Sequence, residues 1–185
     1  MLGQVQARRK TYLNIREGKV VRRTKEGEEY YSYVEGRLES IYSHTRSFRG
    51  EEVEYWYIDL SDEESGELYS IGFPYSSNVF KSIVLSLASA QEYSKIKIMP
   101  YEAGGKTKIV AYAGGEKLNW ISKDMPPLEE IQTGGRTIKD DTKRMRYIGS
   151  LVGDINMRVR NAGAALRMPR VPLPKIPRIN IKMKQ

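Results

Sequence analysis

Residues 53–90 hold the clearest structural pattern in the chain, VEYWYIDLSDEESGELYSIGFPYSSNVFKSIVLSLASA. Residues 53–60 are mostly β-branched and aromatic, which is typical of a strand. Alternation along this strand places Trp56, Ile58 and Leu60 on one face, which predicts the core side of a sheet. The passage as a whole predicts a strand, a turn, a second strand and a helix in direct succession.

The second half of this passage predicts the return strand and a capped helix. Residues 68–75 form the strand, which ends at Pro74 because proline donates no hydrogen bond to a neighbouring strand. Residues 76–78 offer side-chain oxygens to cap the helix, and residues 79–88 carry an apolar stripe at helical spacing. Three large aromatic side chains are expected in the core: Trp56, Phe73 and Trp120.

The other face of this hairpin carries tyrosines beside small residues. If Tyr55 and Tyr57 lie near Ser70 and Gly72, their rings stay open to solvent, because the neighbours are too small to cover them. Open aromatic rings can stack on unpaired bases. The alternative interpretation is that these tyrosines cover a sheet edge or the underside of the helix.

The remaining pattern predicts a mainly β fold with flanking helices. The strand 30–48 contains Gly36 and a slip in its alternation, which predicts a bulge or a sharp bend. Residues 128–139 indicate only a short extended piece around Gly134 and Gly135. The other predicted elements are strands at 12–16, 19–23, 95–101, 107–113 and 118–121 and a helix at 142–166. A long curved strand, a hairpin, a helix and a closing hairpin, in this order, are the elements of an OB-fold, a partly open β-barrel.

Charge and composition divide the chain into a near-neutral body and a basic C-terminal segment. Residues 142–185 hold 11 Lys or Arg and one acid, whereas the rest holds 20 Lys or Arg and 22 acids. The absence of cysteine excludes disulfides and thiol chemistry. We expect no signal peptide, no membrane-spanning segment and a cytoplasmic location. The predicted units are a basic arm with a short hairpin (1–29), an OB-like β-barrel with one helix (30–125), a linker with an amphipathic helix (126–166) and a basic Pro-rich tail (167–185).

Four segments resemble the OB-fold single-stranded DNA-binding proteins of phages and related mobile elements. They are YVEGRLESIY (33–42), EYWYIDL (54–60), YSIGFPYSSNVFKSIVLSLAS (69–89) and GEKLNWI (115–121), and together they cover roughly the middle half of the chain. The resemblance implies an OB-fold, single-stranded DNA as partner and, for a phage protein, a location in the bacterial host cytoplasm. Many such proteins end in an acidic tail that recruits replication partners, whereas this chain ends in a basic one.

The candidate nucleic-acid-binding residues are tyrosines for base stacking and basic residues for phosphate contacts. They are Tyr31, Tyr33, Arg37, Tyr55, Tyr57, Lys97, Lys108, Tyr112, Arg167, Arg170, Lys175 and Arg178. For the strand residues Arg37, Lys97 and Lys108, the alternative is a solvated face with partners such as Glu35 or Glu39. For the basic tail, the alternative is an inert solubilising segment.

No residue pattern predicts a catalytic or metal site. His44 has no second His or Cys nearby, so we expect an ordinary surface residue. Asp62, Glu63 and Glu64 crowd one turn, but their spacing matches no cation-binding loop, and a solvated turn is the simpler interpretation. The chain lacks a Walker-type phosphate loop and a serine nucleophile elbow. We therefore expect no enzyme and no cofactor.

Two main functions follow as hypotheses, and a small domain that binds RNA or modulates a host enzyme is a third option. In the first, the chain is a non-catalytic single-stranded DNA-binding protein of DNA replication or recombination, with self-association or replication proteins as further partners. In the second, it is a structural protein of a virion or a DNA-packaging assembly. Its basic Pro-rich tail would then tether neighbouring subunits or packaged DNA.

Overall fold

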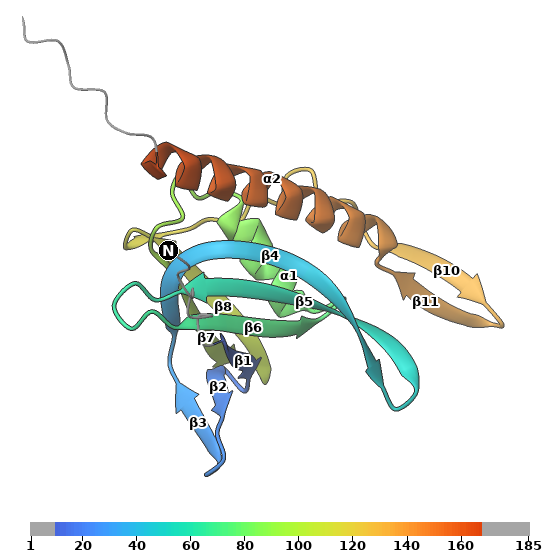
Figure 1. Ribbon diagram of the computed structural model, residues 1–185. Helices are drawn as coiled ribbons and strands as arrows, with labels where there is room; N and C mark the ends of the chain where they lie inside the picture. Colours follow the sequence, from blue (N-terminus) through green and yellow to red (C-terminus); the bar gives the residue numbers. More distant parts are fainter. Residues whose placement is uncertain (1–9, 168–185) are drawn as a thin grey trace, which may run out of the picture.

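The structure is a computed structural model that describes residues 10–167, and its fold is mainly β with a C-terminal helix, as the sequence predicts. The strands are β1 (Lys10–Arg16), β2 (Lys19–Arg23), β3 (Glu28–Tyr31), β4 (Val34–Phe48), β5 (Glu51–Ser61), β6 (Leu68–Pro74), β7 (Ile96–Ala103), β8 (Lys106–Ala113), β9 (Glu116–Lys117), β10 (Glu129–Thr133) and β11 (Arg136–Asp140). The helices are α1 (Asn78–Leu87) and α2 (Thr142–Arg167). Strands β1 to β9 form one sheet in the order β3-β2-β1-β6-β5-β4-β7-β8-β9, while β10 and β11 form a separate hairpin (Figure 1).

The β5–β6 hairpin and α1 match the sequence prediction closely. Trp56 pairs with Phe73 in the ladder, and Ile58 pairs with Ile71. All four side chains are buried in the main hydrophobic core. The Trp56 ring stacks on Phe80 of α1, with centroids 5.0 Å apart, so the helix packs directly beneath the hairpin. The predicted core positions of Trp56 and Phe73 are confirmed.

The predicted strand 30–48 is interrupted, and its second part bends. Residues 34–36 pair with β7, whereas the strand from Arg37 onward pairs with β5, and the register shifts between Leu38 and Ser40. The predicted bulge is therefore confirmed. At Gly36 a Cβ atom would lie only 2.7 Å from the Ser61 carbonyl oxygen, so the two strands can approach this closely only at a glycine.

The sheet curls strongly but does not close into a barrel (Figure 1). The reason is that β1 pairs in parallel with β6 along residues 10–13 and occupies the edge that a closing strand would need. The β1–β2 turn nevertheless reaches β7 and β8 from across the curl. The Gly18 N–H donates to Thr107 Oγ1 at 3.2 Å, and a Cβ at Gly18 would lie 2.6 Å from the Glu102 nitrogen.

The C-terminal part of the sheet is shorter than predicted. The strand expected at 118–121 is replaced by β9, which ends at Lys117. Trp120 follows this end and is 57% exposed, so its predicted core position is wrong. Alternation indicates burial only within a strand, and Trp120 lies after the end of β9. Leu118 alone keeps a link to the sheet, through its N–H to the Ala111 carbonyl.

Helix α2 confirms the helix predicted at 142–166 and lies along β4 (Figure 1). Its apolar stripe buries Met145, Ile148, Val152 and Ile155. The Asn156 side chain accepts a hydrogen bond from the Ile41 N–H at 2.9 Å and donates one to the Ile41 carbonyl at 2.7 Å. At Ile41, β4 pairs with β5 on one edge and has no neighbouring strand on the other among the described residues. The Asn156 amide supplies the hydrogen bonds that the Ile41 backbone would otherwise lack there.

We expect Asn156→Ala to lower the free energy of unfolding by about 2 kcal/mol or more, because it leaves both backbone groups of Ile41 without their partner. Urea unfolding followed by circular dichroism measures this loss. Asn161→Ala, at an exposed position of the same helix, is the matched control and should change stability by less than about 0.5 kcal/mol. Equal effects of both substitutions would contradict the anchoring role of Asn156.

Candidate nucleic-acid interface

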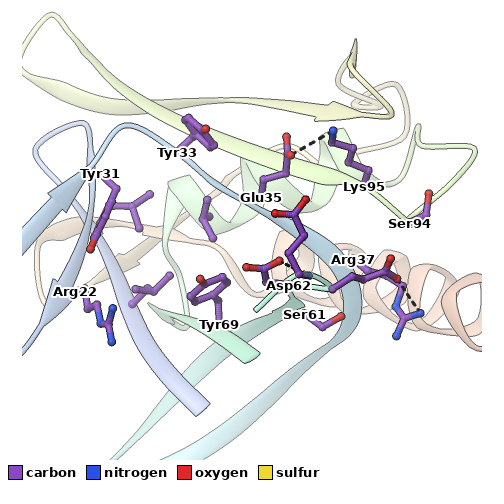
Figure 2. Close-up of a pocket in the computed structure, with 16 residues that line it drawn as sticks. Arg22, Tyr31, Tyr33, Glu35, Arg37, Ser61, Asp62, Tyr69, Ser94 and Lys95 are labelled. Carbon is purple, nitrogen blue, oxygen red and sulfur yellow. Dashed lines mark hydrogen bonds and ion pairs between the residues drawn. The ribbon is translucent and has the colours of Figure 1, made fainter. Parts of the chain in front are cut away.

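A pocket of about 680 Å³ opens between the β2–β3 ribbon, the start of β4 and the β5–β6 turn. Figure 2 shows Tyr31, Tyr33 and Tyr69 around it. The pocket brings together three of the predicted site residues: Tyr31, Tyr33 and Arg37. It also contains Arg22 of β2 and Tyr69 of β6, which the sequence analysis missed because these two strands come to line one pocket only in the folded sheet.

The basic residues of this pocket are paired with carboxylates. Arg37 lies 2.9 Å from Glu39 and 3.4 Å from Glu63. Glu39 is one of the partners that the alternative interpretation of Arg37 names. Lys95 lies 3.5 Å from Glu35 across the ladder (Figure 2). Because these charges are compensated, the pocket favours polar or aromatic groups over a phosphate.

The ribbon that presents Tyr31 is held by an ionic network. Glu28 contacts Arg16, Arg23 and the Tyr30 hydroxyl. The Tyr30 hydrogen bond, followed by those from Arg16 and Arg23, lowers the pKa of Glu28 to about 2. The Tyr31 hydroxyl donates to Glu29 at 2.6 Å, and this bond raises the pKa of Tyr31. Tyr31 is therefore oriented by its own strand.

A second surface, the β7–β9 face, lies beside the pocket. Its tyrosines and lysines are Tyr33, Lys97, Tyr101, Lys108, Tyr112 and Lys117, because residues paired across strands point to the same side of a sheet, and Glu35, which pairs with Lys97 in the ladder, lies on that side too. The Lys97 amine lies 3.9 Å from the centre of the Tyr33 ring. Lys97 also pairs with Tyr112, and Tyr112 pairs with Lys117. Tyrosines and lysines thus alternate across β7, β8 and β9.

The β7–β9 face differs from the pocket in its charge. Glu35 faces Lys97 in the ladder but forms its ion pair with Lys95, and within residues 10–167 no carboxylate forms an ion pair with Lys97, Lys108 or Lys117. Tyr33 and Tyr101 are 48% and 41% exposed. The sequence analysis identified four of the six residues and missed Tyr101 and Lys117. Strand parity could have found both, because Tyr101 follows Lys97 by four residues and Lys117 follows the Gly114-Gly115 turn.

Tyr57 is not open to solvent, which corrects the expectation for the β5 face. It does pair with Gly72, as the sequence suggested, but it is only 3% exposed. Tyr42 of β4 stacks on it with centroids 5.4 Å apart, and the Arg46 guanidinium lies 4.9 Å from its ring centre. Tyr55, near the start of β5, remains half-buried.

Lys10 completes this closed tyrosine cluster. Its amine donates to the Tyr42 hydroxyl at 2.6 Å and to Asp59 at 2.9 Å. Burial opposes the charge of Lys10, but these hydrogen bonds outweigh that effect and raise its pKa. Beneath it, three buried oxygens have no hydrogen-bond partner among the described residues: Tyr57 Oη, Asp59 Oδ1 and Ser70 Oγ. The cluster is therefore a packed part of the sheet rather than an open stacking platform.

The remaining predicted residues lie at or beyond the end of the described chain. Arg167 is the last residue of α2, and Arg170, Lys175 and Arg178 lie outside the described residues. His44 is exposed on β4. Between residues 10 and 167, no group of three or more His, Asp or Glu side chains is arranged to hold a metal ion. No helix in that range is long and apolar enough to span a membrane.

Comparison of the chain with protein-family models, with curated proteins and with solved structures found no match.

We expect Tyr57→Phe to be neutral or stabilising, because it removes a buried hydroxyl that has no partner. Tyr57→Ala should lower the free energy of unfolding by about 3 kcal/mol or more, since it leaves a cavity beside Tyr42. Thermal and urea unfolding measure both changes. A fully stable Tyr57→Ala protein would contradict the packing role of this ring.

Glu28 should remain ionised down to about pH 2, which a side-chain NMR titration measures. A carboxylate whose folded pKa is lowered stabilises the ribbon above its unfolded pKa, and this contribution disappears as the pH falls through the folded value. Tyr30→Phe should raise the Glu28 pKa more than Arg23→Gln does, because the Tyr30 hydrogen bond is the largest contributor. The reverse order would show that the arginine pairs dominate.

Proposed function

We propose that this chain binds single-stranded DNA without catalysing a reaction and acts in DNA replication or recombination. The observation that carries the proposal is the β7–β9 face, where Tyr33, Tyr101 and Tyr112 alternate with Lys97, Lys108 and Lys117. Stacking on a tyrosine ring contributes about 1–3 kcal/mol per base with little sequence preference. Lys97, Lys108 and Lys117, none of which forms an ion pair within residues 10–167, supply the phosphate contacts that such binding needs.

The chemistry of this face favours single strands over duplexes. Stacking requires a free base surface, which a duplex does not offer without local melting. The order β6-β5-β4-β7-β8, with α1 between β6 and β7, supports an OB-like core in which the sheet exterior binds an extended strand. In this proposal, the tyrosines and lysines lie outside the curl and the apolar core lies inside it.

The test is a titration of a fluorescent single strand of about 20 nucleotides, and of its duplex, with the full chain at low and moderate salt. We expect preferential single-strand binding that survives moderate salt. Tyr33→Ala and Tyr112→Ala should each weaken it by about 1–3 kcal/mol, and Lys97→Gln should reduce the salt slope by about 0.7.

Two matched controls separate this face from the rest of the surface. Tyr12→Ala removes a tyrosine that is 55% exposed on β1, a strand that pairs with β2 and β6 and not with β7, β8 or β9, and should leave the affinity unchanged. Lys123→Gln removes the charge of an exposed lysine in the loop after β9 and should leave the salt slope unchanged. Equal, salt-sensitive binding to both DNA forms, unaffected by the tyrosine substitutions, would refute the proposal. That result would favour the virion or DNA-packaging role, in which only electrostatics attract the polyanion.

A further inference from the structure

The β10–β11 hairpin projects from the first turn of α2, away from the large sheet (Figure 1). Ile131 and Ile138 pair across this hairpin and lie on the same side of it, 46% and 53% exposed. A two-stranded hairpin is marginally stable in water unless its apolar face is covered. The hairpin therefore has an apolar face and two strand edges that the described part of the chain leaves uncovered.

We propose that a second copy of this chain covers the hairpin, with β11 pairing antiparallel to β11 of the partner subunit about a two-fold axis at Ile138. The two-residue turn, with positive φ at Gly134 and Gly135, closes on the pair Thr133–Arg136. Hydrogen-bonded pairs alternate along an antiparallel ladder, so Thr137 directs its N–H and C=O to the outer edge of β11, as Lys139 does.

This backbone pattern is self-complementary about Ile138. Thr137 of one copy then lies opposite Lys139 of the partner subunit, and the two residues exchange N–H···O=C bonds. Ile138 faces its own counterpart as the non-hydrogen-bonded pair between them. The result is a four-stranded antiparallel sheet with the four isoleucines of the two copies on one face.

The charges of β11 fit the same register. Arg136 falls opposite Asp140 of the partner subunit, and the symmetry repeats this pair on the other side of the axis. Within one hairpin, Asp140 faces Glu129, which Lys143 already neutralises. Asp140 is ionised, because hydrogen bonds from Thr142 lower its pKa. The partner's Arg136 would thus offset the remaining negative charge at this site.

The opposite edge of the hairpin has no such match. Pairing β10 with itself about Ile131 sets Glu129 opposite Thr133 and Glu130 opposite Gln132, so no opposite charges meet. The geometry therefore selects β11 over β10 as the shared edge. This inference does not depend on DNA binding, since none of these residues belongs to the β7–β9 face.

Proline substitutions test which edge pairs. Thr137→Pro removes an outward N–H on β11, whereas Gln132→Pro removes the equivalent group on β10, and both lose the same Gln132–Thr137 side-chain bond. Sedimentation of the full chain should show a reversible dimer that Gln132→Pro retains. Thr137→Pro should dissociate it at least about tenfold more readily, because two intersubunit donors are lost. A monomeric wild-type chain, or equal effects of the two prolines, would overturn the proposal.

A cysteine pair tests the axis itself, because the natural chain contains no cysteine. Ile138→Cys should form a disulfide-linked dimer under mild oxidation, since directly opposed residues lie within disulfide reach. Ile131→Cys, on the same face, would lie about three strand spacings from its counterpart, or about 14 Å, and should not cross-link. Equal cross-linking of both variants would refute the two-fold axis at Ile138.

Discussion

The bend of β4 is the constraint on which the rest of the structure depends. One strand belongs to both halves of the sheet, since residues 34–36 pair with β7 and the following residues pair with β5. The change occurs at Gly36, beside the Ser61 carbonyl, where any side chain would force the two strands apart. Helix α2 then satisfies the freed edge of β4 through Asn156 and Ile41. Gly36 therefore permits the close approach at the bend, and Asn156 adds a polar anchor to the apolar packing of α2.

This bend also divides the tyrosines into two environments. Tyr33 precedes it and lies against Lys97 of β7, with much of its ring exposed. Tyr42 follows it and packs on Tyr57, where Lys10 completes a closed cluster. Similar residue types are thus exposed on one side of the bend and packed on the other. Their role depends on whether an adjacent strand supplies a covering side chain.

The sequence was sufficient where structure is local. Alternation predicted the burial of Trp56 and Phe73, and the Ser77 cap with its apolar stripe predicted α1, because these signals lie within a few residues. It failed for Tyr57, whose covering residue Tyr42 comes from a different strand in a register that only the fold defines. It failed for Trp120 because β9 ends at Lys117, before that residue. Outside a strand, alternation along the sequence no longer indicates which side chains are buried.

The two proposals are linked by valency, although each stands on its own residues. One β7–β9 face offers three tyrosines, which limits the stacking energy that a single copy can supply. Two copies joined through β11 would make the second contact on a long strand intramolecular, and so raise the apparent affinity without any new contact. Helix α2 connects the hairpin to the core, through the Lys81–Asp141 ion pair and the Asn156 amide. The salt dependence of DNA binding at each β7–β9 face would then be unchanged. The gain in apparent affinity from dimerisation would instead vary with protein concentration and with the length of the DNA strand.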